Sequence, residues 1–239
     1  MMRMKIIKMT KAFLILIVPV GVAGWFVCAG CAAAPPNSLA MHNPSRWENE
    51  IAAYERSDAT NPPPPGCIVF TGASYIRKWA PRLATDFPNM QVIDRGFGGA
   101  WLADVYYYAD RIIIPYAPRE VVIYAGGNDV FFGLRSEFVF GDFVALMKKL
   151  HQALPKAKLV FISLPPSPSR WADTARFKRV NDLIANYCNR HNIGFVDAFK
   201  LMLGPDGKPL PGIYDKGRLH MNAAGYDIWR DALKPYLIP

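Results

Sequence analysis

Short, uniformly apolar runs alternate along this chain with longer amphipathic stretches, and this alternation constrains the fold more than any other feature. The apolar runs have the length and composition of buried strands rather than of surface helices. They occupy residues 67–71, 91–94, 121–125, 159–163 and 193–197, and stretches with helical spacing occupy 75–83, 103–111, 140–154, 172–191 and 223–236. Such alternation is typical of a parallel sheet covered by helices on both faces. The sequence therefore predicts one doubly wound α/β domain.

Small and polar residues follow the predicted strands. Ser74 comes after the first strand, the glycine-rich segment 96–99 after the second, and Asn128 after the third, while His220 lies just before the last helix. In a parallel sheet the carboxyl ends of the strands share one edge, and ligands collect there. We therefore expect these residues to converge at that edge.

The residue types at this edge suit acyl transfer. A serine hydroxyl attacks a carbonyl only if a base accepts its proton, and histidine is the side chain suited to that task near neutral pH. Of the four histidines, only His220 lies in a loop on this edge. The backbone amides of Ser74 and Gly99 and the side-chain amide of Asn128 would supply hydrogen bonds to a developing oxyanion.

Four segments carry a resemblance to a known family. The segments IVFTGASYIRKW, DRGFGGAWLADV, YAGGND and RLHMNAAGY resemble the four blocks of the SGNH (GDSL-like) hydrolases, over residues 67–239. The resemblance implies Ser74 as nucleophile, His220 as base, and Ser74, Gly99 and Asn128 as oxyanion donors. It also implies a flavodoxin-like three-layer sandwich with a five-stranded parallel sheet of order 2-1-3-4-5.

The chain departs from the family pattern at two positions. Ala73 replaces the acid of the usual Gly-Asp-Ser, which is not a catalytic residue. Gly217 stands three residues before His220, where the family carries aspartate. Asp215 is the nearest carboxylate; either it reaches the imidazole or a backbone carbonyl orients the ring. Loss of the orienting acid costs up to about 10⁴-fold in rate, so a weakened enzyme and a domain that only binds both stay open.

Residues 1–34 read as an export segment. A basic stretch precedes the apolar run 12–26, and the small residues before Cys31 resemble a bacterial lipobox, which predicts Cys31 as the lipidation site. The alternative is an uncleaved anchor over 12–34, long enough to cross the ~30 Å hydrocarbon core of a bilayer. Both predict a bacterial cell-envelope protein tethered to the membrane on its periplasmic side.

Residues 35–66 lie between the leader and the domain at 67–239. They are rich in proline, asparagine and serine, and this composition predicts a tether and strap over the domain.

The net charge of +9 does not indicate a nucleic-acid partner, because four of the 28 basic residues lie in the leader without any acid and the rest are scattered. Cys67 and Cys188 predict either a disulfide or two buried thiols. No cysteine or histidine spacing suits a metal, and we expect neither metal nor cofactor.

The expected function is that of an envelope-tethered serine esterase. It would cleave a carboxylic ester, such as an acylated sugar or glycan, a lysophospholipid or a small acyl ester, through an acyl-Ser74 intermediate. The alternative is a catalytically impaired SGNH-like domain that binds an envelope glycan or a protein partner.

Overall fold

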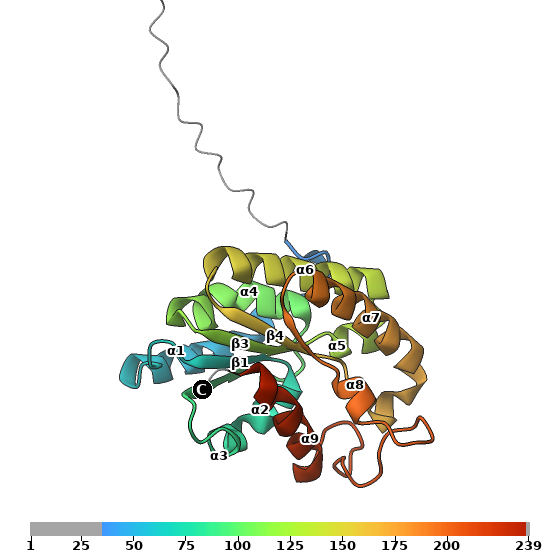
Figure 1. The fold of residues 1–239 in the computed structure, drawn as a ribbon. Helices are drawn as coiled ribbons and strands as arrows, with labels where there is room; N and C mark the ends of the chain where they lie inside the picture. Colours follow the sequence, from blue (N-terminus) through green and yellow to red (C-terminus); the bar gives the residue numbers. More distant parts are fainter. Residues whose placement is uncertain (1–34, 238–239) are drawn as a thin grey trace, which may run out of the picture. The chain divides into compact units, whose positions relative to one another are not determined.

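The structure is a computed structural model and describes residues 35–237. Its five strands form one parallel sheet in the order β2-β1-β3-β4-β5, which confirms the predicted flavodoxin-like α/β fold (Figure 1). The strands are β1 (Ile68–Gly72), β2 (Val92–Gly96), β3 (Glu120–Tyr124), β4 (Lys158–Ile162) and β5 (Gly194–Val196).

Helices cover both faces of the sheet (Figure 1). Helices α4, α6 and α7 pack side by side on one face, and α2, α3 and α9 lie on the other. The helices are α1 (Glu48–Thr60), α2 (Ser74–Trp79), α3 (Leu83–Asp86), α4 (Leu102–Ile112), α5 (Gly127–Phe131), α6 (Ser136–Ala153), α7 (Thr174–Arg190), α8 (Ala198–Leu201) and α9 (Ala223–Leu233).

The register of the central strands places the functional loops at one level. Gly72 at the end of β1 pairs with Gly96 of β2 and with Tyr124 of β3, so the three strands end together. Gly72 has a φ of +126°, and a Cβ there would lie 1.9 Å from the Tyr124 carbonyl oxygen. Only glycine fits this position. The residues that follow the three strands therefore emerge beside one another.

Two predicted helices end earlier in the structure than in the prediction. Helices α2 and α9 each stop two residues before a proline, Pro81 and Pro235, and short 3₁₀ turns follow. Proline has no amide hydrogen to donate and disfavours helical backbone in the residue before it. Helices α3, α5 and α8 were not predicted, because four or five residues are too few to show helical periodicity.

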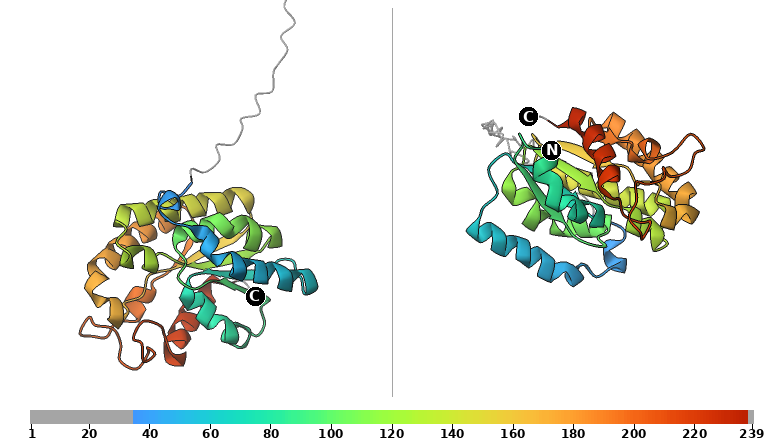
Figure 2. Two further views of the ribbon diagram at one scale, coloured as in Figure 1. Left: turned by 180° about the vertical axis from the view of Figure 1, so that it is seen from behind. Right: turned by 90° about the horizontal axis from the view of Figure 1, so that it is seen from below.

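The strap, residues 35–66, packs against the domain through its middle part. Its 3₁₀ turn Pro44–Trp47 and helix α1 lie along α4 (Figure 2, left). Trp47 is 4% exposed and Ile51 is fully buried, so both side chains belong to the hydrophobic core. Near its start, the backbone N–H of Asn37 donates to Asp142 of α6 at 2.5 Å.

Further predictions from the sequence concern the two cysteines, the leader and metal binding. Cys67 and Cys188 are two buried free thiols, which is the second of the two arrangements expected from the sequence; they do not form a disulfide. The leader at 1–34, with Cys31, lies outside the described residues. Within 35–237, no helix is both long and apolar enough to cross a bilayer. In the same range, no cluster of three or more His, Cys, Asp or Glu side chains could hold a metal ion.

Candidate active site

Ser74 and His220 meet at the carboxyl edge of the sheet. Ser74 is the first residue of α2 and follows β1 by two residues, while His220 lies in the loop before α9. The Ser74 Oγ lies 2.8 Å from the His220 Nε2. With the ring proton on Nδ1, Nε2 accepts a hydrogen bond from the hydroxyl. This is the geometry in which a histidine can remove the proton from an attacking serine.

A tight turn holds His220 in place. The backbone N–H of Asp215 donates to the carbonyl of His220 at 2.8 Å, and Arg218 N–H donates to the Asp215 carbonyl at 2.9 Å. The Tyr75 hydroxyl donates to the carbonyl of Leu219, and the Tyr75 ring centroid lies 5.2 Å from that of the imidazole. The residue after Ser74 therefore helps to position the loop that carries His220.

Asp215 lies close to the imidazole without a hydrogen bond to it. Its Oδ2 is 4.0 Å from His220 Nδ1, and its side chain is 37% exposed. A hydrogen bond requires a donor–acceptor distance of roughly 2.7–3.2 Å. Asp215 therefore acts on the ring through its charge, from the side of Nδ1 that a serine-hydrolase acid would occupy.

The surroundings of His220 favour its neutral form. Burial lowers the pKa of His220 below the usual 6.5, and the nearby cations Lys78 and Arg170 lower it further, while Asp215 raises it in part. A general base must be unprotonated to accept a proton. The imidazole therefore stands in its working form at neutral pH.

The three predicted oxyanion donors also lie after strands that end at this edge. Asn128 at the start of α5 donates from Nδ2 to the Ala100 carbonyl at 3.0 Å, and its Oδ1 accepts from Arg170 Nη2 at 2.9 Å. Because a guanidinium only donates and a carbonyl only accepts, these two bonds fix the orientation of the amide. Among the described residues, no acceptor binds the amide hydrogens of Ser74 and Gly99.

Arg170 was not among the predicted site residues. It follows β4 at the same edge, donates from Nη1 to the Gly127 carbonyl at 3.0 Å and lies over the Phe131 ring at 4.4 Å. Together with its bond to Asn128, these contacts tie Arg170 to helix α5. An arginine in the loop after the fourth strand was the available signal, since that loop opens at the same edge.

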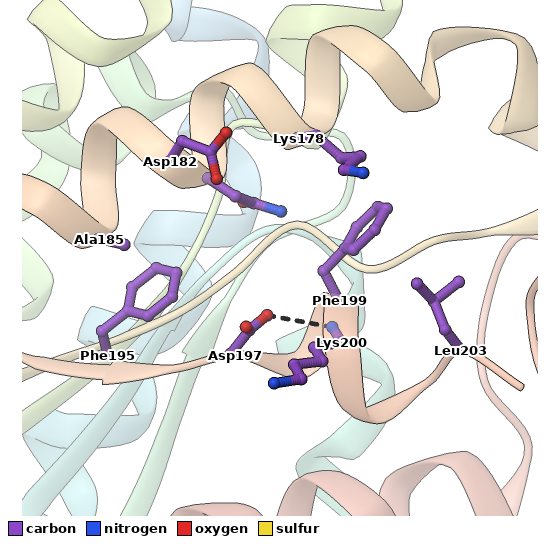
Figure 3. Close-up of a pocket in the computed structure, with 9 residues that line it drawn as sticks. Lys178, Asp182, Ala185, Phe195, Asp197, Phe199, Lys200 and Leu203 are labelled. Atoms are coloured by element: carbon purple, nitrogen blue, oxygen red, sulfur yellow. Dashed lines mark hydrogen bonds between the residues drawn. The ribbon is translucent and has the colours of Figure 1, made fainter. Parts of the chain in front are cut away.

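A separate pocket lies between α7, β5 and α8, and none of the predicted site residues lines it (Figure 3). Two of its polar side chains, Asp197 and Asn181, form hydrogen bonds with nearby backbone. Asp197 accepts from the backbone N–H of Lys200 at 3.0 Å. Asn181 donates to and accepts from the backbone of Leu164 at 3.0 and 2.9 Å. We therefore place the active site at the strand ends and not in this pocket.

A flavodoxin-like sheet that brings a serine, a histidine, a glycine turn and an asparagine to one edge has the arrangement of the SGNH class of hydrolases. The chain belongs to the GDSL-like lipase/acylhydrolase family, because the model of that family matches residues 60–228. Membership places it among the ester hydrolases. Residues 35–59, most of the strap, lie outside the matched region.

Solved structures share the fold at low sequence identity. A GDSL-like lipase from Bacteroides thetaiotaomicron aligns with a TM-score of 0.64 and 24% identity, covering 81% of this chain and 96% of that one. A lipase/acylhydrolase from Enterococcus faecalis aligns with a TM-score of 0.58 and 20% identity, covering 72% of this chain and 97% of that one. An acetyl xylan esterase aligns with a TM-score of 0.59 and 20% identity, covering 72% of this chain and 99% of that one. No curated protein matches the sequence significantly.

Proposed function

We propose that this protein hydrolyses a carboxylic ester through an acyl-Ser74 intermediate while tethered to the membrane of a bacterial cell envelope. The distance of 2.8 Å between Ser74 Oγ and His220 Nε2 is the observation that carries the proposal. The tether is inferred from the leader sequence, with Cys31 as the lipid-bearing residue or residues 12–34 as an anchor.

The reaction has two halves. His220 Nε2 takes the hydroxyl proton as Ser74 Oγ bonds to the carbonyl carbon of the ester. The oxyanion accepts hydrogen bonds from the amides of Ser74 and Gly99 and from Asn128 Nδ2. The carbon–oxygen bond to the alcohol then breaks, and His220 returns the proton to that oxygen. In the second half His220 takes a proton from water as the water oxygen bonds to the acyl carbon. The bond from that carbon to Ser74 Oγ then breaks, and His220 returns the proton to Oγ, which releases the acid and restores the serine.

Acylated sugars, lysophospholipids and small acyl esters are the proposed substrate classes. A groove that includes Arg218, two residues before His220 in the chain, supports the first two. It is lined by Trp171, which is 37% exposed, by Pro168 and Pro209, and by the cations Lys208 and Arg218. Apolar rings suit a sugar face and cations suit a phosphate or another anionic group. One protein of similar fold is an acetyl xylan esterase.

Ester turnover by the full-length protein should persist at mildly acidic pH. Because a low pKa keeps the His220 imidazole neutral, we expect kcat/KM for a short p-nitrophenyl ester to reach half its maximum below pH 6.5 on the acid side. The measurement is the pH profile of initial rates at constant ionic strength. A half-maximum above pH 7 would contradict the proposed environment of His220, and absence of turnover at every pH would contradict the proposed function.

Asp215→Asn should have a moderate effect. Since the carboxylate supplies charge but no hydrogen bond to the ring, we expect kcat to fall by about 10- to 100-fold, well short of the 10⁴-fold that follows loss of a hydrogen-bonded acid. The acid limb of the pH profile should also shift to lower pH, because Asp215 raises the pKa of His220. An unchanged profile would show that the carboxylate does not act on the ring.

The alternative function is a domain that binds an envelope glycan or a protein partner. It is supported by the 4.0 Å between Asp215 and the imidazole, because a histidine without a hydrogen-bonded acid is a weaker base. The two functions differ in turnover. A binding domain would retain a glycan or partner without releasing p-nitrophenol, whereas the enzyme would release it in a reaction that depends on Ser74.

A further inference from the structure

The strap contacts the glycine turn directly. The Trp47 Nε1–H donates to the carbonyl of Gly98 at 2.7 Å, and Arg46 Nη2 donates to the carbonyl of Gly99 at 3.1 Å. A Cβ added at Gly99 would lie 3.9 Å from Trp47 Cζ2, so the indole ring packs against the turn itself. Two consecutive carbonyls of the turn are thus held by a segment that lies outside the family match.

The bond to Gly98 fixes a proposed catalytic donor. The carbonyl of Gly98 and the N–H of Gly99 belong to one trans peptide unit, in which the two groups point in opposite directions. Holding the carbonyl toward Trp47 therefore directs the Gly99 N–H to the other side. Gly99 has a φ of +78°, and glycine on both sides of the unit removes the Cβ contacts that restrain rotation elsewhere. An external hydrogen bond is what selects one orientation.

Trp47 is itself rigidly held. Its side chain is 4% exposed, its ring packs edge-on against Phe97 at 5.7 Å, and the Arg46 guanidinium lies over it at 3.6 Å. In helix α1, Glu48 and Glu55 both form ion pairs with Arg111 of α4, at 2.8 and 2.6 Å. The strap therefore offers the turn a donor with little freedom to move.

A second contact secures the far end of the turn. The His42 ring stacks on Trp101 at 4.2 Å, and its Nε2 lies 3.0 Å from the Asp104 Oδ2. That carboxylate oxygen also accepts from the Trp101 backbone N–H at 2.7 Å. The strap thus holds both sides of the segment that contains Gly99.

We propose that Trp47 is a positioning residue of the oxyanion hole, and that the strap completes the active site by locking the Gly98–Gly99 peptide with the Gly99 N–H facing the substrate. This inference rests on the proposed ester hydrolysis. It extends the active site beyond the region that the family shares, because the residue that orients the donor lies in the strap.

Trp47→Phe tests the inference, since it keeps an aromatic ring but removes the indole donor. Loss of one oxyanion donor lowers kcat by about 10²- to 10³-fold. In this variant the Gly99 N–H is kept but is free to rotate, so kcat should fall less, by about 10- to 100-fold. KM should change by less than about threefold, because this group does not bind the ground-state ester. Affinity for a trifluoromethyl ketone, whose adduct with Ser74 carries an oxyanion, should fall in parallel with kcat.

The matched control is Trp79→Phe. Trp79 is fully buried and its Nε1 donates to Asp86 at 2.6 Å, so this variant also loses a buried indole hydrogen bond, but away from the turn. We expect its kcat to stay within about threefold of wild type. Arg46→Met, at an exposed position, provides a second variant outside the core. It removes both the bond to the Gly99 carbonyl and the guanidinium over the Trp47 ring, and it should lower kcat about two- to fivefold.

Measurements of kcat and ketone affinity on the full-length protein distinguish three results. A fall in kcat and in ketone affinity for Trp47→Phe but not for Trp79→Phe supports the inference. Unchanged kcat for Trp47→Phe, or equal losses in both tryptophan variants, overturns it and leaves Trp47 as a packing residue. A wild-type protein without ester turnover would instead refute the proposed function, and the wild-type rate alone identifies that case.

Discussion

Replacing Ser74 with alanine is expected to lower kcat for ester hydrolysis by about 10⁶-fold, which is the size of effect that follows removal of a serine nucleophile. The residual rate would come from binding and from the oxyanion donors, which can act on attack by water. The change removes one hydroxyl and its bond to His220 and leaves the backbone of α2 untouched. Steady-state rates with p-nitrophenyl acetate and butyrate measure the loss.

Two controls accompany the Ser74 variant. Ser57→Ala, on the exposed face of α1, should keep wild-type kcat. The melting temperature of Ser74→Ala should stay close to that of wild type, since no buried apolar contact is lost. A Ser74→Ala protein that is folded and retains more than a few per cent of the rate would show that another group performs the attack.

Replacing His220 with alanine is expected to cost nearly as much, about 10⁵- to 10⁶-fold in kcat, because a serine hydroxyl without a base is a weak nucleophile. The two groups act as a unit. The double variant Ser74→Ala/His220→Ala should therefore be no slower than either single variant, and a double-mutant cycle over kcat measures this non-additivity.

The control for His220 is His151→Ala, at an exposed position near the end of α6. It should keep wild-type activity. If the effects of Ser74→Ala and His220→Ala were instead independent and multiplied, the 2.8 Å contact between their side chains would not be a proton-transfer pair.

The fold could be predicted from the sequence because each strand is a short apolar run whose burial depends on its place in the sheet. The central strands β1 and β3 are buried at every position, and the outer strands β2 and β5 are partly exposed. The ends of α2 and α9, two residues before Pro81 and Pro235, could not be predicted from periodicity. The helix breaks there because proline lacks an amide hydrogen, and the apolar pattern does not record this.

The gathering of the candidate site residues at one edge of the sheet could be predicted for a related reason. Ser74, Gly99 and Asn128 each follow a strand, and strands in register deliver their next residues to one edge. Arg170 and Trp47 were missed because their contribution is a side-chain hydrogen bond to a loop carbonyl or amide distant in sequence, and such a bond leaves no periodic trace.

The position of the acid could not be predicted either. Whether Asp215 reaches the imidazole depends on the turn 215–218, which places Arg218 at a φ of +55° and brings the Asp215 backbone against the His220 carbonyl. The position of the carboxylate depends on this turn and on the side-chain conformation of Asp215, and the residue types alone specify neither. The structure places Asp215 Oδ2 4.0 Å from His220 Nδ1, which is too far for a hydrogen bond.

Covalent trapping tests the central claim most directly. An alkyl fluorophosphonate forms a stable phosphonyl ester only with a serine whose proton is withdrawn by a base. Incubated with the full-length protein and followed by intact mass and peptide mapping, it should add one phosphonyl group, located on Ser74, and add none to the His220→Ala variant on the same timescale. A wild-type protein that stays unmodified, or carries the group on another serine, would contradict the account.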